Sequence, residues 1–227
     1  MKKQLLFTLI FMLLAFGVTI NSIAQYGKWQ HDTSFKGIEF KKIKFRTDEK
    51  PYFSKALYAN GVLEEPTVIQ GFPCHGKIIL DKDGILKQFR LAEDAEVAGN
   101  KFKKNTFIAI RRDKSYHIAC PYRPNVQGYE IRRTPYRSPF YIGSTNFQLY
   151  PNGRLSYFLP VDDIEIDGVR CRPSATRGGV HLYENGKLKE CTSAGEQTIQ
   201  GKKVYKNYEL KFDENGNLTY MEKEKIF

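Results

Sequence analysis

The chain has 227 residues and a formal net charge of +11, from 36 basic and 25 acidic side chains. That length suffices for one ordinary domain or two small ones. The basic excess is compatible with anionic partners, but the lysines are spread along the whole chain. This spread favours a role for the lysines in keeping solvent-facing strands from aggregating, and it disfavours a dedicated binding site for a polyanion.

Residues 1–24 are predicted to form a signal peptide. Lys2 and Lys3 precede the apolar run 5–16, and the small residues of 22–24 stand where a signal peptidase reads, just before Gln25. An uncleaved membrane anchor is the alternative, but polar residues weaken the end of the run, and a spanning helix needs about 20 apolar residues. Cleavage is therefore favoured.

The expected mature protein is 25–227, with a charge of +9 because Lys2 and Lys3 are lost. No second apolar run of spanning length follows, so we expect no integral membrane segment after cleavage. The predicted location is the periplasm, the cell envelope or the medium, and nucleic acid is a disfavoured partner for an exported chain.

Four cysteines remain, an even number that permits two disulfides in an exported chain. They are Cys74, Cys120, Cys171 and Cys191. Their spacing matches no zinc site, and their pairing cannot be deduced from sequence. Free buried thiols are the alternative, because a domain of this size can build a core without cross-links.

The organising feature is an internal repeat, in which apolar or aromatic residues lead into Asn-Gly or Asp-Gly and a Leu follows two residues later. Its five copies span 57–63, 80–86, 149–155, 182–188 and 212–218. Asn-Gly and Asp-Gly take up the positive φ values of tight hairpin turns, so each copy predicts a β-hairpin. The irregular gap before Gly153 suggests a further turn at 112–115.

A second element follows each turn: an apolar residue, one more residue, and Gly. It occurs at 69–71, 97–99, 166–168 and 199–201, and it predicts a connecting bend between strands. Ile38 and Phe40 alternate out of phase with Ile43 and Phe45, which predicts a bulge between the two pairs. The stretches 91–97 and 159–166 are predicted to be non-helical.

These patterns predict an all-β protein of repeated antiparallel hairpins, forming an elongated meander sheet, a solenoid or a barrel-like domain. The predicted domain covers 25–227 and includes an irregular insertion at 121–147. Tyr183–Lys189, and next Tyr150–Leu155, resemble the bacterial variety of MORN-type repeats. That resemblance implies hairpins laid side by side and a non-catalytic surface for protein or membrane contact. It implies no site residues.

No catalytic motif is found: there is no nucleophile elbow, zinc-protease motif, phosphate loop or dinucleotide fingerprint. Asp162 and Asp163 are a carboxylate pair, but they are expected on a solvated bend. The sequence therefore predicts no enzyme, no catalytic residue, no metal site and no cofactor.

The insertion is the candidate contact surface, because arginines there interleave with tyrosines and prolines and binding residues often lie on loops. Its candidate binding residues are Tyr129, Arg132, Arg133, Tyr136, Arg137 and Tyr141. An irregular linker whose tyrosines cover a sheet edge is the alternative.

The predicted function is an exported, non-enzymatic interaction or envelope-associated module, whose partner is an unidentified protein or an anionic envelope component. One alternative is an extracytoplasmic enzyme acting on a cell-wall or extracellular polymer. It requires a deep polar pocket that joins a carboxylate to a His or Cys. A spacer without any ligand is the third hypothesis.

Overall fold

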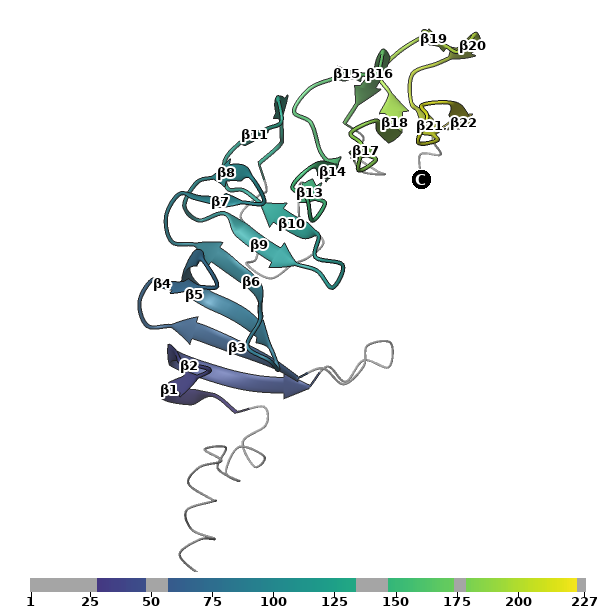
Figure 1. Cartoon of the computed structure of the whole chain (residues 1–227). Helices are drawn as coiled ribbons and strands as arrows, with labels where there is room; N and C mark the ends of the chain where they lie inside the picture. The colour runs from purple at the N-terminus through teal and green to yellow at the C-terminus, as the bar shows by residue number, and fades with distance from the viewer. Residues whose placement is uncertain (1–27, 48–56, 134–146, 174–178, 224–227) are drawn as a thin grey trace, which may run out of the picture. The chain divides into compact units, whose positions relative to one another are not determined.

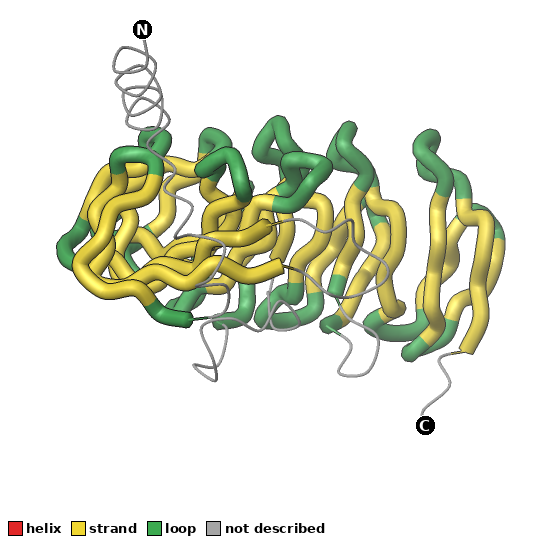
Figure 2. The backbone as a smooth tube through the Cα atoms, turned by 90° about the horizontal axis from the view of Figure 1, so that it is seen from below, coloured by secondary structure: helices red, strands yellow, loops and turns green. Residues whose placement is uncertain are grey.

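The computed structural model describes residues 28–47, 57–133, 147–173 and 179–223. Figure 2 shows only strands and loops in this part of the chain, which confirms the all-β prediction. The predicted signal peptide lies outside the described residues, so export stays a prediction. Within the described ranges, no helix has the length and apolarity needed to cross a membrane.

The chain divides into two compact units, and Figure 1 labels strands of each. The first comprises Met1–Glu65 and Gly76–Leu86. Its strands are β1 (Gln30–Phe35), β2 (Ile38–Thr47), β3 (Leu57–Leu63) and the second half of β5 (Phe72–Asp81). Neighbouring strands pair antiparallel in the order β1-β2-β3-β5.

The second unit comprises Pro66–His75 and Lys87–Phe227. Besides the first half of β5, its strands are β4 (Thr67–Ile69), β6 (Leu86–Leu91), β7 (Ala95–Val97), β8 (Asn100–Phe102), β9 (Phe107–Ile110), β10 (Tyr116–Ala119), β11 (Asn125–Val126), β12 (Tyr129–Glu130), β13 (Phe147–Leu149), β14 (Leu155–Phe158), β15 (Ile164–Ile166), β16 (Val169–Arg172), β17 (Val180–Leu182), β18 (Leu188–Ser193), β19 (Gln197–Ile199), β20 (Lys202–Val204), β21 (Tyr208–Phe212) and β22 (Leu218–Lys223).

The pairing in this second unit is an open antiparallel meander. Its backbone order is β6-β9-β10-β13-β14-β17-β18, and β16 and β21 both pair with β18. Among the described residues, no pairing closes either unit into a ring. Of the three predicted arrangements, the meander sheet is the one observed.

Two kinds of hairpin alternate along the second unit. The main hairpins are β9–β10, β13–β14, β17–β18 and β21–β22, and the side hairpins are β7–β8, β11–β12, β15–β16 and β19–β20. Each side hairpin precedes a main hairpin in the chain, so the side and main hairpins together form the repeating unit.

The main hairpins turn through three-residue loops. In β13–β14, the Gly153 N–H donates to the Tyr150 carbonyl (2.9 Å) and the Tyr150 N–H donates to the Arg154 carbonyl (2.8 Å). Gly153 has φ +83°, which identifies a type I turn followed by a glycine bulge. The same bonds recur at Gly84, Gly186 and Gly216. The predicted turn at 112–115 is confirmed, with Lys114 in the glycine position at φ 65°.

The side hairpins use a tighter, two-residue turn. Both central residues have positive φ, as in Gln200 (48°) and Gly201 (76°), which is the type I′ geometry. The predicted bends at the second Gly of each repeat are therefore hairpin turns in their own right. A further example, Gln127–Gly128, lies in β11–β12 inside the range 121–147, and sequence analysis missed it.

One predicted hairpin is wrong. Asn60–Gly61 lies inside β3, where Gly61 pairs with Ile43 on one side and Ile78 on the other. The glycine is needed for packing instead of turning, because a Cβ there would lie 2.1 Å from the ring of buried Phe40. The predicted bulge in β2 is confirmed by the register shift between Phe40 and Lys42.

The core is a ladder of equivalent positions in successive side hairpins. The residue two before each turn Gly is buried, as are Val97, Val126 and Ile166. The residue three after it is also buried, and this position holds Cys74, Phe102, Ile131, Cys171 and Val204. The stretches 91–97 and 159–166 end in the ladder strands β7 and β15, so their non-helical prediction is confirmed.

All four cysteines are free and buried, and they occupy core positions. Burial raises the pKa of Cys74 to about 12 and that of Cys120 to about 11. A hydrogen bond to the Cys191 thiol, together with burial, raises the pKa of Cys171. The thiols therefore pack as small apolar side chains, as in the free-thiol alternative.

A side chain from each of three side hairpins is bound to the main hairpin that follows. The Gln127 amide donates to the Gly153 carbonyl (2.8 Å) and accepts from the Leu155 N–H (3.2 Å). Gln200 makes the same two bonds, to the Gly216 carbonyl (2.8 Å) and the Leu218 N–H (2.9 Å). We call Gln127, Asp167 and Gln200 the clamp residues.

Asp167 forms half of this clamp. Its Oδ2 accepts from the Leu188 N–H at 2.8 Å, and a carboxylate has no proton to donate to a glycine carbonyl. All three clamp residues have positive φ, which costs an L-residue about 1–2 kcal/mol. The side chains are thus held in a strained backbone position from which they reach the next hairpin.

Replacing Gln200 with alanine is expected to lower the free energy of unfolding by about 1–2 kcal/mol, because two hydrogen bonds are lost and the positive φ is kept. Chemical denaturation of wild type and variant measures the difference. Lys202→Ala, at an exposed position in the same hairpin, is the control and should change stability by less than about 0.5 kcal/mol. Equal stability of the two variants would show that the clamp contributes nothing.

The burial of the four free thiols leads to a second testable prediction. In folded protein that has never been exposed to reductant, none of the cysteines should react with a thiol reagent, because all four side chains are buried. After unfolding without reductant, titration should count four thiols. A count of two or none would contradict the free-thiol structure.

Candidate functional site

One side chain from each of nine neighbouring strands forms a continuous row in the second unit. These residues are direct cross-strand partners, so they share one face of the sheet. The outer row consists of Gln88, Ala109, His117, Gln148, Tyr157, His181, Glu190, Lys211 and Tyr220. Their chain neighbours Phe89, Ile118 and Leu210 are fully buried, so the row lies on the face opposite to the core.

A register shift in three main hairpins enlarges this face. The shift leaves Ser156, Lys189 and Thr219 without a partner residue across the strand pair. Such a bulge lets two consecutive residues point away from the core. Ser156 joins Tyr157 and Lys189 joins Glu190 on the outer face.

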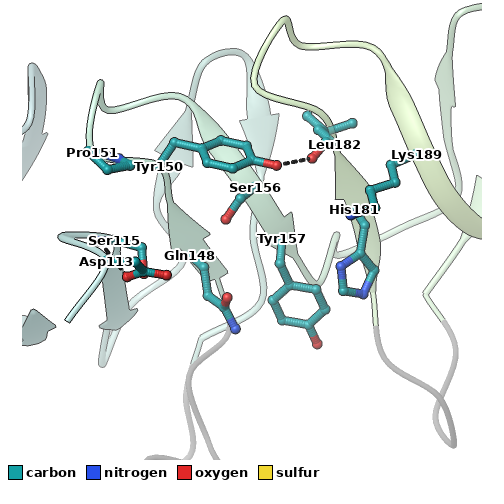
Figure 3. A pocket seen from close by; sticks show the side chains of 10 residues that line it. All are labelled: Asp113, Ser115, Gln148, Tyr150, Pro151, Ser156, Tyr157, His181, Leu182 and Lys189. Atoms are coloured by element: carbon teal, nitrogen blue, oxygen red, sulfur yellow. Dashed lines mark hydrogen bonds between the residues drawn. The ribbon is translucent and has the colours of Figure 1, made fainter. Parts of the chain in front are cut away.

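A groove of about 380 Å³ lies on the middle of the row. It is lined by Asp113, Ser115, Gln148, Tyr150, Pro151, Ser156, Tyr157, His181, Leu182 and Lys189. Figure 3 shows the side chains of Gln148, Tyr157 and His181 projecting to the same side from three neighbouring strands. At the turn end of the groove, the Tyr150 hydroxyl donates to the Leu182 carbonyl at 2.9 Å and holds the two hairpins together.

Contacts run along the row beyond the groove. The rings of Tyr157 and His181 are in contact, with centroids 4.8 Å apart and planes tilted by 48°, and His181 faces Glu190 on the next strand. The Lys211 ammonium lies 4.0 Å from the Glu190 carboxylate and 5.2 Å from the centre of the Tyr220 ring. The second half of the row is therefore one connected set of side chains.

The first half of the row is more enclosed. Ala109 is 2% exposed, and Gln88 Oε1 and His117 Nδ1 are buried without a hydrogen-bond partner within the described part of the chain. From Gln148 onward the side chains are half-buried, and Tyr220 is 39% exposed. Gln88 and His117 are also half-buried as whole residues, so we take Gln148 to Tyr220 as the accessible part because none of its described residues is fully buried or has an unpartnered buried atom.

Burial keeps the histidines of the row uncharged. It lowers the pKa of His181, and the nearby Lys189 and Lys211 act in the same direction while Glu190 opposes them. Burial also lowers the pKa of His117, with Arg111 adding to the effect and Asp113 opposing it. At neutral pH both imidazoles therefore present one donor and one acceptor nitrogen.

The carboxylate in the groove is tied into its own turn. Asp113 Oδ1 accepts from the Ser115 hydroxyl (2.6 Å) and the Ser115 N–H (3.0 Å), and these bonds lower the pKa of Asp113. Within the described ranges, no cluster of three or more His, Cys, Asp or Glu side chains could hold a metal ion.

The predicted binding residues fall partly within the described residues. Tyr129 stacks on the core residue Phe158 with centroids 4.8 Å apart, and burial raises the pKa of its hydroxyl. Arg132 and Arg133 are exposed, and the Arg132 N–H donates to the Leu159 carbonyl. Tyr136, Arg137 and Tyr141 lie outside the described residues. Tyr129 is half-buried, and none of Tyr129, Arg132 and Arg133 belongs to the outer row.

Sequence analysis missed the outer row, although a local signal was present. After the turns of β13–β14, β17–β18 and β21–β22 the pattern is apolar, polar, polar, apolar, as in Leu155–Phe158 and Leu188–Cys191. Two consecutive polar residues break the period of two and indicate a bulge that faces both outward. Which strands lie side by side, and hence which polar residues line up, required the register.

Comparison with known proteins finds no matching family model, no matching curated protein and no matching solved structure. The resemblance to MORN-type repeats therefore stays a prediction, and the function is argued from this chain alone.

The lowered histidine pKa values predict a pH-dependent stability. Below the ordinary histidine pKa of about 6.5 the unfolded chain binds protons that the folded chain resists, so the free energy of unfolding should fall between pH 7 and pH 5. His181→Gln should make that fall shallower, because one of the buried imidazoles is removed. Stability that is constant or rises as the pH falls would contradict the burial of these rings.

Proposed function

We propose that this chain is an exported, non-enzymatic binding module, and that the outer row from Gln148 to Tyr220, with its groove, is the contact surface. The observation that supports the proposal is the in-register alignment of hydrogen-bonding and ring side chains over six neighbouring strands. A sheet face that only met solvent would need no such connected row, and short charged side chains would serve it equally well.

The groove supports binding in preference to catalysis. Its carboxylate, Asp113, accepts hydrogen bonds from Ser115, and its imidazole, His181, is in contact with the Tyr157 ring. A general acid–base pair needs the two groups within hydrogen-bond reach of one reacting atom. The one arrangement that favours an enzyme is His181 facing Glu190, and this pair is the site that the alternative would use.

Binding to the cell envelope tests the proposal. Protein purified as the cell exports it should bind saturably to an envelope fraction of the same cells. Tyr157→Ala combined with Tyr220→Ala should weaken that binding about tenfold or more, because both remove ring contacts at the row. Arg132→Ala combined with Arg133→Ala tests the surface predicted from sequence and should leave the affinity within about twofold.

Two outcomes would contradict the proposal. Loss of binding only in the arginine variant would move the contact surface to residues 121–147. Release of soluble fragments from the envelope fraction, abolished by Glu190→Gln, would make the chain an enzyme. Circular dichroism of each variant establishes that the fold is retained.

A further inference from the structure

The accessible row contains both aromatic rings and hydrogen-bonding groups. Tyr157, His181 and Tyr220 supply aromatic faces, and Gln148 and Glu190 supply amide and carboxylate groups. An aromatic ring offers an apolar face and, in tyrosine, a polar end. Pyranose sugars present the complementary pair of surfaces, an apolar C–H face and a rim of hydroxyl groups.

The direction of the row limits the ligand. It runs across the strands, and neighbouring strands lie about 4.8 Å apart, so a ligand that follows it meets a new side chain at that interval. Each sugar advances an extended hexopyranose chain by a similar distance. An extended peptide advances about 3.3 Å per residue, so its residues would not match the spacing of the strands.

The charges of the row favour an uncharged ligand. Its one ammonium, Lys211, lies 4.0 Å from Glu190 and 2.9 Å from Glu209, which compensate it locally. Lys189, at the rim of the groove, lies over the Tyr183 ring at 5.3 Å. A polyanion would meet the two carboxylates, and nucleic acid would find no line of free cations along the row.

The geometry points to a single extended, uncharged polysaccharide chain as the ligand, lying across the strands from Gln148 to Tyr220 at about one sugar per strand. The groove beside Tyr157 and His181, with a volume of about 380 Å³, falls within the range of ligand-binding pockets and holds the chain at its middle. This inference rests on the proposed function and names the ligand class of the same site.

Calorimetric titration of the exported protein with soluble β-1,4-linked glucan oligosaccharides of two to six sugars tests the inference. The affinity should rise with each added sugar, because each reaches another side chain of the row. An α-1,4-linked hexamer, which coils, should bind more weakly than the extended β-linked hexamer. Oligogalacturonate of the same length tests whether the row binds a polyanionic chain instead.

Two exposed tyrosines, one in the row and one outside it, provide the test variant and its control. Tyr220 is 39% exposed in the row, and Tyr205, which directly follows β20, is 45% exposed. Tyr220→Ala should weaken hexamer binding about tenfold, the effect of one lost aromatic contact. Tyr205→Ala should leave it within about twofold.

Equal affinity for the dimer and hexamer, binding of the polyanion alone, or equal effects of the two tyrosine variants would overturn the inference. If no glucan binds while the envelope fraction still binds through the row, the ligand class is wrong and the proposed function stands. If envelope binding is also absent, both fail.

Discussion

The interaction on which the rest of the structure depends is the side-chain clamp between consecutive hairpins. A side hairpin of two short strands is too small to be stable alone and must pack on a neighbour. Gln127 and Gln200 each bind a glycine carbonyl and a leucine N–H just beyond the next main turn, and Asp167 binds the corresponding N–H. The clamp therefore supplies partners for backbone groups at a glycine bulge and fixes where that bulge lies.

Next to each clamped turn lies the register shift at Ser156, Lys189 or Thr219, which has a consequence on the opposite face of the sheet. A shift of one residue would turn every side chain beyond the bulge to the other face. With the register held, Tyr157, Glu190 and Tyr220 all point outward and meet the residues of the next strand. The core ladder and the outer row are thus two results of one register, and the proposed contact surface is built from strand residues.

The sequence contained much of the fold but little of the site. Asn-Gly steps predicted three of the four main turns, and Asp83–Gly84 predicted the β5–β6 turn, because the glycine must take positive φ. The phase change around Phe40 predicted a bulge. Asn60–Gly61 misled because a glycine is also required where a ring packs on a strand. Sequence analysis placed the contact surface at 121–147 because arginine and tyrosine cluster there, whereas the row draws one residue from each strand. Only strand order and register bring such residues together.

Hydrogen exchange at the Leu155, Leu188 and Leu218 amides, resolved by NMR, tests the central claim most directly. These N–H groups donate to the clamp residues at 3.2, 2.8 and 2.9 Å. If the clamps fix the register, all three amides should exchange much more slowly than in an unstructured peptide of the same sequence. Exchange at the unstructured rate in the folded protein would mean that the clamps do not form, and that some other contact sets the bulges and the row.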